Sequence, residues 1–297
     1  MAELTQHEIA ERGAMRGTVA TAGRRLEYEW LGPGPEAAPT LVFLHDGQGC
    51  VDTWRDFPAA LAAATGCGAL VYSRAGYGGS EELPGPWPVS FMHDEARVAL
   101  PQVLAALGVR DGFLVGHSDG ASISLIYAAM GAGANGGVGT NGGAGAGGYG
   151  DGGAGAHSGT WLRGLVLEAP HVFVEPVCLE SIAMLPALYR QPDLWRRMVR
   201  HHGANAQNCY ESWVDVWLRP EFRSWNIEDR LPQVRCPALA IQGAQDVYGT
   251  LDQLRAVAAG CGGPTETLVI EGCGHTPHRQ QREATLAAMT GFLRQLL

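Results

Sequence analysis

Residues 112–121 read GFLVGHSDGA and contain the pattern G-x-S-x-G at positions 116–120. The apolar residues 113–115 in front of the pattern predict a buried strand, and residues 118–130 predict a helix. A strand, a tight turn and a helix in this order hold a serine hydroxyl at the tip of a sharp bend. Ser118 is therefore a candidate nucleophile.

A second interpretation of Ser118 is an ordinary N-cap of the following helix. Because the chain contains 42 glycines, G-x-S-x-G alone is weak evidence. A nucleophilic serine needs a base that accepts its proton and a carboxylate that orients this base, whereas an N-cap needs neither. The presence of such partners elsewhere in the chain decides between the two interpretations.

Candidate partners follow two later strands. Residues 238–242 (ALAIQ) predict a strand that is followed by Asp246, and residues 267–270 (TLVI) predict a strand that is followed by His275. In a parallel sheet, both side chains lie beyond the C-terminal edge, where Ser118 also lies. The three residues form a candidate catalytic triad.

The rest of the chain alternates strand and helix patterns. This alternation predicts an α/β fold with a mostly parallel central sheet and helices on both faces. Pro101 is expected to kink or split its helix. The remaining predicted strands are 16–21, 25–31, 40–44, 69–72 and 165–167, and the remaining predicted helices are 54–65, 90–107, 251–259 and 280–296.

Two segments interrupt this alternation. Residues 131–160 are mostly Gly and Ala and predict a flexible surface insertion, because they have little apolar surface to bury. Residues 171–230 contain no strand pattern but many large apolar residues, which predicts a helical cap. The expected organisation is a core of residues 1–170 and 231–297 with a cap of residues 171–230.

Two further motifs accompany the candidate triad. Residues 44–49 (LHDGQG) follow the third strand, and residues 73–80 (SRAGYGGS) follow the next one. With the serine turn and the downstream Asp and His, the chain outside 131–160 resembles the α/β-hydrolase superfamily, in its serine-nucleophile, capped form. The resemblance implies a triad of Ser118, Asp246 and His275 and an oxyanion hole made of the backbone N–H groups of Gly47 and Asp119. It implies no cofactor.

The chain departs from this superfamily at two positions. Asp46 directly follows the histidine of the first motif, where the superfamily usually has Gly; Asp tolerates left-handed backbone better than most residues, which offers a conformational reason. Ser73 stands where the superfamily often has Asp and is expected to affect the loop rather than the chemistry. The carboxylate of Asp119 is expected near the positive N-terminal end of its helix rather than at the reacting oxygen.

The leading prediction for function is hydrolysis of a carboxylic ester or thioester of a small to medium, apolar acyl group through an acyl-enzyme. A serine nucleophile argues against haloalkane dehalogenases and epoxide hydrolases of the superfamily, which use Asp. Carbon–carbon bond hydrolysis is the alternative within the superfamily. A receptor-like protein that binds a ligand without turnover is the alternative of another class.

Several residues are candidates for the substrate pocket, but others have simpler interpretations. We expect His45 and His117 to orient loops, His201 and His202 to form a solvated helix end, and His275 and His278 not to bind a metal, since no third ligand accompanies them. The pocket candidates are Asp46, His171, Phe173, Trp213, Trp217 and Val247.

Composition limits the partners of the chain. The net charge of −9 argues against nucleic acid, which requires a basic surface. The sequence shows no apolar run long enough for a membrane span and no signal peptide at its beginning, and its seven cysteines form no metal or disulfide pattern. We therefore expect a cytoplasmic protein that acts on a small molecule; the sequence does not determine its oligomeric state.

Overall fold

The computed structural model describes residues 14–21, 23–131 and 161–297. Within them, eight strands form one sheet in the order β1-β2-β4-β3-β5-β6-β7-β8. β1 and β2 form an antiparallel hairpin, β2 pairs antiparallel with β4, and all other neighbours are parallel. The bounds are Ala14–Thr21 for β1, Arg24–Leu31 for β2, Thr40–Leu44 for β3, Gly68–Tyr72 for β4, Gly112–His117 for β5, Leu162–Glu168 for β6, Ala238–Gly243 for β7 and Thr265–Ile270 for β8.

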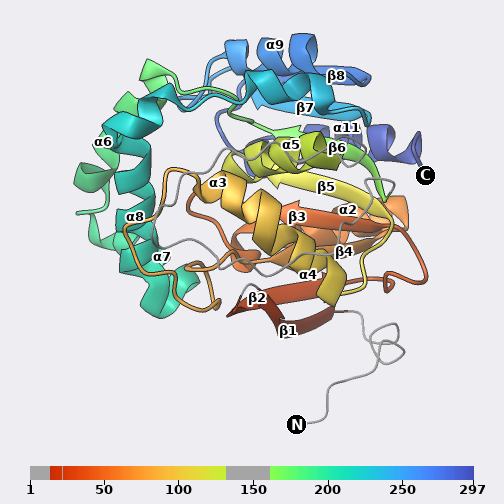
Figure 1. Cartoon of the computed structure of the whole chain (residues 1–297), viewed down its shortest axis with the longest axis horizontal. Helices are drawn as coiled ribbons and strands as arrows, with labels where there is room; N and C mark the ends of the chain where they lie inside the picture. The colour runs from red at the N-terminus through yellow and green to blue at the C-terminus, as the bar shows by residue number, and fades with distance from the viewer. Residues whose placement is uncertain (1–13, 22, 132–160) are drawn as a thin grey trace.

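The central strands are continuous apolar runs because both of their faces are covered. Every residue of β3, β4 and β5 is buried. Helices α2 (Phe57–Thr65) and α11 (Arg282–Arg294) pack on one face, and α4 (Leu100–Ala106), α5 (Asp119–Gly131) and α9 (Leu251–Gly260) cover the other (Figure 1). The predicted α/β fold with a mostly parallel sheet is confirmed.

Two predicted helices are divided in the structure. The first consists of α3 (Phe91–Asp94), a π-helical turn (Glu95–Ala99) and α4. Pro101 is the second residue of α4, and because it has no N–H to continue the helical hydrogen-bond pattern, the irregular turn lies directly before it. The last predicted helix is interrupted at Gln281 (φ −134°), which separates α10 (Pro277–Gln280) from α11.

Three α-helices lie between β6 and β7 in the chain: α6 (Pro176–Leu188), α7 (Pro192–His202) and α8 (Ala206–Leu218). They stand together at one end of the sheet (Figure 1). We call residues 171–230 the cap. The glycine-rich insertion predicted over 131–160 lies outside the described residues except for Gly131, which ends α5.

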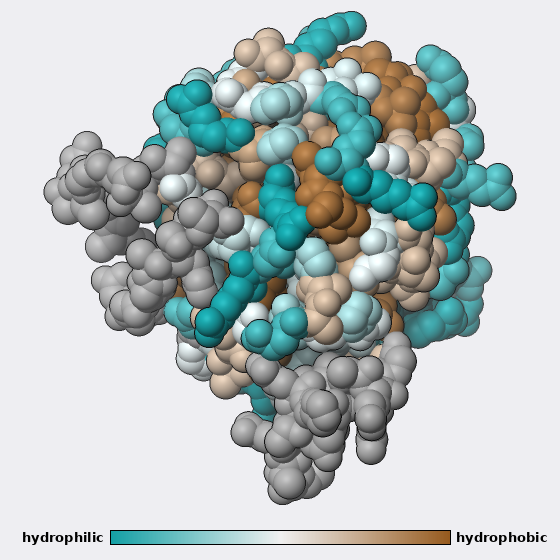
Figure 2. Space-filling view, turned by 90° about the vertical axis from the view of Figure 1, so that its right-hand side faces the viewer, coloured by the Kyte–Doolittle hydropathy of each residue, from teal (hydrophilic) through white to brown (hydrophobic). Residues whose placement is uncertain are grey.

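The face of the molecule away from the cap carries hydrophilic and apolar side chains intermixed (Figure 2). No helix in the described ranges combines the length and the apolar character that crossing a membrane requires.

Candidate functional site

The nucleophile position lies in the turn that joins β5 to α5. The backbone of Ser118 is left-handed, with φ 54°, a conformation that costs a non-glycine residue on the order of 1–3 kcal/mol. A Cβ on Gly116 would lie 2.4 Å from the carbonyl oxygen of Gly120, and a Cβ on Gly120 would lie 2.0 Å from a carbonyl oxygen of β3. The two glycines therefore allow the strand and the helix to approach closely enough for this sharp turn.

The structure brings the three candidate triad residues together. His275 Nε2 lies 2.9 Å from Ser118 Oγ. His275 Nδ1 lies 2.9 Å and 2.8 Å from the two carboxylate oxygens of Asp246. Asp246 Oδ1 also accepts a hydrogen bond from the backbone N–H of Tyr248 at 2.8 Å. When Nδ1 donates to Asp246, the lone pair of Nε2 is available for the proton of Ser118.

The electrostatics of the site favour an ionised Asp246 and a basic His275. Burial opposes a charge on His275, but the carboxylate and hydrogen bond of Asp246 raise the pKa of His275 above its ordinary value. Burial also opposes the charge on Asp246, yet the charge of His275 and the hydrogen bonds lower the pKa of Asp246. The pair can therefore stabilise the imidazolium that forms when His275 takes a proton.

The two candidate oxyanion donors belong to different segments. Gly47 lines the same cavity as Ser118, while Asp119 occupies the first position of α5, where helix N–H groups lack intrahelical partners. Within the described residues, neither N–H donates to another protein group. A Cβ on Gly47 would lie 2.1 Å from Trp213 Nε1, so the indole of this cap residue covers the loop closely.

A cavity of about 190 Å³ adjoins the triad. We call it the inner cavity. Its lining includes Asp46, His171, Trp213 and Trp217 of the predicted pocket, together with Cys178, Ile182 and Leu185 from α6. The α6 residues were not foreseen, although the apolar spacing of this helix was a possible signal. Burial lowers the pKa of His171 to about 3, so this ring is neutral.

The structure places the other two pocket candidates elsewhere. Phe173 pairs through its backbone with Asn226, and the side chain of Val247 is 55% exposed. Neither contributes to the lining of the inner cavity in the described part of the chain. Nearness in sequence to β6 or to Asp246 does not determine the direction of these side chains.

The carboxylate of Asp119 is fully buried and connects the nucleophile turn to the cap. Asp119 Oδ2 accepts a hydrogen bond from Trp213 Nε1 of α8 at 2.9 Å, and Arg74 Nη2 lies 3.8 Å from the same oxygen. Oδ1 has no hydrogen-bond partner among the described residues. Burial raises the pKa of Asp119, while Arg74 and Trp213 oppose the shift. Sequence reasoning placed this carboxylate at a helix end but missed its partner in the cap.

Trp213→Phe is expected to lower the free energy of unfolding by about 1–3 kcal/mol, because it leaves a buried carboxylate without its hydrogen bond. Urea denaturation measures this change. Trp225→Phe is the matched control, because Trp225 is another buried cap indole whose Nε1 has no partner in the described residues. An equal loss in both variants would show that indole volume, and not the bond to Asp119, carries the effect.

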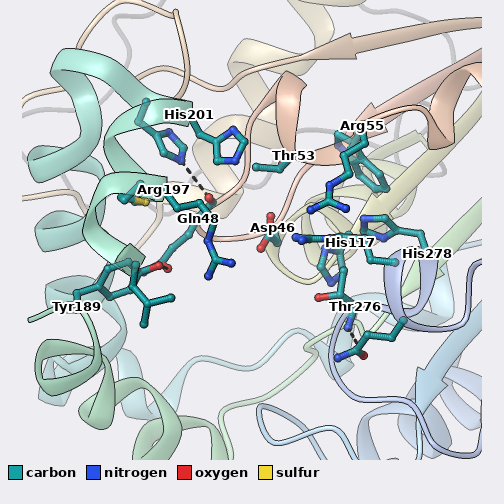
Figure 3. Close-up of a pocket in the computed structure, with 16 residues that line it drawn as sticks. Asp46, Gln48, Thr53, Arg55, His117, Tyr189, Arg197, His201, Thr276 and His278 are labelled. Carbon is teal, nitrogen blue, oxygen red and sulfur yellow. Dashed lines mark hydrogen bonds between the residues drawn. The ribbon is translucent and has the colours of Figure 1, made fainter. Parts of the chain in front are cut away.

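A second buried cluster contains His117, Glu168 and His278, and Figure 3 shows its two histidines next to each other. His278 Nδ1 lies 2.6 Å from Glu168 Oε2, and His117 Nε2 donates to the carbonyl oxygen of His275 at 2.7 Å. Burial lowers the pKa of His117 to about 4, so its ring is neutral. The candidate ligand atoms of these three side chains lie within 4.8 Å of one another, as metal ligands do, but they include atoms already used in these hydrogen bonds. Through its hydrogen bond to the carbonyl oxygen, His117 holds the backbone of His275 in place.

The expectation of a solvated helix end at residues 201–202 is wrong for His202. This side chain is buried. Its Nδ1 accepts from the backbone N–H of Gly78 at 3.0 Å, and its Nε2 lies 3.0 Å from the carbonyl oxygen of Gln48. Because Gly78 and Gln48 belong to the two loops after β4 and β3, His202 fastens the end of α7 to both of them.

Comparison with known proteins agrees with the fold. The model of the family described as "Alpha/beta hydrolase family" matches residues 41–288. No match was found among curated proteins.

Solved structures show the same fold at low sequence identity. VinJ is 22% identical with a TM-score of 0.69, and the alignment covers 95% of this chain and 99% of VinJ. The enol-lactonase from Burkholderia xenovorans is 16% identical with a TM-score of 0.66, covering 93% and 99%. A thermophilic esterase from Thermogutta terrifontis is 18% identical with a TM-score of 0.61, covering 95% and 99%.

Proposed function

Because the chain belongs to the alpha/beta hydrolase family, we propose that it is a serine hydrolase of carboxylic esters or thioesters with a small to medium, apolar acyl group. The observation that carries this proposal is the continuous hydrogen-bonded chain from Ser118 Oγ through His275 to Asp246. The apolar α6 side chains in the inner cavity support the acyl preference. The esterase and the lactonase among the similar structures are consistent with ester chemistry.

The proposed reaction has two stages. In the first, His275 takes the proton of Ser118 as Oγ attacks the acyl carbonyl, and the oxyanion receives hydrogen bonds from the N–H groups of Gly47 and Asp119. The tetrahedral intermediate collapses to the acyl-enzyme, and His275 gives its proton to the leaving alcohol or thiol. In the second stage, water attacks the acyl carbon, His275 takes a proton from this water and returns it to Ser118 Oγ, and the carboxylic acid is released.

A fluorophosphonate probe tests whether the serine is activated. Labelling that mass spectrometry locates at Ser118, together with turnover of an aryl ester, supports the proposal. Binding without labelling and without turnover would instead favour the receptor-like alternative. Turnover of a carbon–carbon substrate such as a vinylogous 1,5-diketone, with no turnover of esters or thioesters of varied acyl length, would favour the carbon–carbon hydrolase.

We expect kcat/KM for an ester to rise with pH and to level off above the pKa of His275. The sign follows from the mechanism, because only the neutral imidazole can accept the proton of Ser118. Since Asp246 raises the pKa of His275, the midpoint should lie above the ordinary histidine value of about 6.5. A pH–rate profile with a neutral ester measures it, and activity that stays constant down to pH 5 would contradict a role for His275 as base.

A further inference from the structure

A second, larger cavity of about 470 Å³ adjoins the inner one. We call it the outer cavity. It shares Asp46, Gln48 and Thr276 with the inner cavity. Three arginines line it, each from a different part of the chain: Arg55 follows the 3-10 helix Val51–Trp54, Arg197 lies on α7 of the cap, and Arg279 lies on α10. Figure 3 shows Arg55 and Arg197 on opposite sides of Asp46.

The positive charges in the outer cavity are poorly compensated. Within the described ranges, none of the three arginines forms an ion pair with a carboxylate, whereas the neighbouring Arg196 pairs with Asp193. Burial and the nearby charges of Arg55 and Arg197 lower the pKa of Arg279. Asp46 is the carboxylate in the lining. All three arginines are exposed to solvent and outnumber this carboxylate, so they leave the lining of the outer cavity with an excess of positive charge in a chain whose net charge is −9.

The backbone conformation of Arg55 also supports a functional role for this residue. Its φ is 55° and its ψ is −130°, a conformation that glycine adopts easily and that is costly for other residues. Non-glycine residues with such a strained backbone cluster at functional sites.

The two cavities differ in chemistry and lie differently with respect to the triad. Apolar α6 side chains line the inner cavity, as an acyl chain requires. Thr276, which directly follows His275, lines both cavities, so the outer cavity lies next to the residue that donates its proton to the leaving group. Asp46 lines both cavities, but within the described part of the chain arginines accompany it only in the outer one, so an anionic group is better accommodated there.

We infer that the outer cavity binds an anionic group, a phosphate or a carboxylate, on the leaving-group side of the substrate. This inference rests on the proposed hydrolase function and narrows it to esters or thioesters that release an anionic alcohol or thiol. Guanidinium groups suit both anions, because their paired N–H donors match two oxygens at once.

Three aryl butyrates with one acyl group test the inference: the butyryl esters of 4-hydroxybenzoate, of its neutral methyl ester, and of 4-hydroxyphenyl phosphate. We expect kcat/KM at low ionic strength to be about tenfold or more higher for an anionic ester than for the neutral one, as a charge-assisted contact allows. The preference should fall as salt screens the charges. The anionic ester with the larger ratio shows whether carboxylate or phosphate is preferred.

Single substitutions locate the effect. Arg197→Gln and Arg279→Gln are expected to reduce the ratio of anionic to neutral kcat/KM, while Arg196→Gln, which removes an adjacent charge on the same helix, leaves the ratio at the wild-type value. Arg55→Gly removes the third guanidinium and suits the left-handed backbone, so it is expected to lower the ratio without loss of thermal stability.

The two levels of the proposal fail in different ways. Suppose that the neutral ester is hydrolysed but the ratio of anionic to neutral kcat/KM is near one. The anion site is then overturned, while the proposed hydrolase function is supported. The same conclusion follows if Arg197→Gln and Arg279→Gln keep the wild-type ratio. If no ester is hydrolysed, the proposed function fails, and calorimetry with phenyl phosphate decides the anion site. Binding that Arg279→Gln weakens and Arg196→Gln does not supports the site, and no binding overturns it.

Discussion

Ser118→Ala is expected to lower kcat for an aryl butyrate by about 10⁴-fold or more, the scale on which loss of a triad nucleophile acts. The reason is that Ser118 Oγ, 2.9 Å from His275 Nε2, is the only protein atom in the proposed mechanism that bonds to the acyl carbon. Without it, no acyl-enzyme can form. Stopped assays at high enzyme concentration measure the remaining rate, and mass spectrometry checks that the acyl-enzyme is absent.

Ser124→Ala is the matched control for this variant. Ser124 is also buried on α5, but its hydroxyl donates to the carbonyl oxygen of Gly120 within the same helix. It should retain activity close to that of the wild type. A Ser118→Ala protein that folded normally and kept more than about a tenth of wild-type kcat would contradict the covalent mechanism, because triad loss acts on a far larger scale.

Asp246→Asn is expected to lower kcat by about 10⁴-fold, as tautomer reversal does in other serine triads. The backbone N–H of Tyr248 donates to Oδ1 of Asp246, and an Asn that keeps this bond presents its NH₂ group to His275 Nδ1. Nδ1 must then act as acceptor, so Nε2 carries the hydrogen and cannot take the proton of Ser118. Loss of the carboxylate also lowers the pKa of His275, the reverse of the shift seen here.

Steady-state kinetics across pH separates these two effects. The profile of Asp246→Asn should show both a much lower plateau and a midpoint shifted to lower pH. Asp252→Asn controls for the loss of one negative charge, because Asp252 is exposed and pairs with Arg255 on α9. If Asp246→Asn lost less than tenfold in kcat, another group would have to orient His275.

The sequence predicted the central sheet well because burial on both faces produces unmistakable apolar runs. β3 and β5 lie where TLVFL and GFLV indicated. The helix predictions were weaker at their ends. Periodicity did not distinguish one long helix from α3, a π-helical turn and α4, because such breaks depend on local hydrogen bonding that leaves the apolar pattern unchanged.

The candidate site likewise has some features that the sequence predicts and others that it does not. Ser118, Asp246 and His275 were predictable because each lies shortly after the end of a strand, and the C-terminal ends of parallel strands meet at one edge. Three other features could not be predicted from the sequence: the hydrogen bond between Asp119 and Trp213, the burial of His202 and the convergence of arginines at the outer cavity. Each depends on where a loop or a cap helix comes to lie, and loop and cap positions carry no periodic signal.

The sequence by itself therefore determined the fold class and the order of the candidate catalytic residues, because these follow from apolar patterns and from positions relative to strand ends. The tertiary structure decided which side chains surround them: α6 beside the triad, Trp213 on the carboxylate of Asp119, and three guanidinium groups around Asp46. The physical reason is that a strand end is a local property of the chain, whereas a cavity arises only when segments far apart in sequence pack together. In GFLVGHSDGA the turn that holds Ser118 could be predicted from the sequence, but the partner of the neighbouring Asp119 could not.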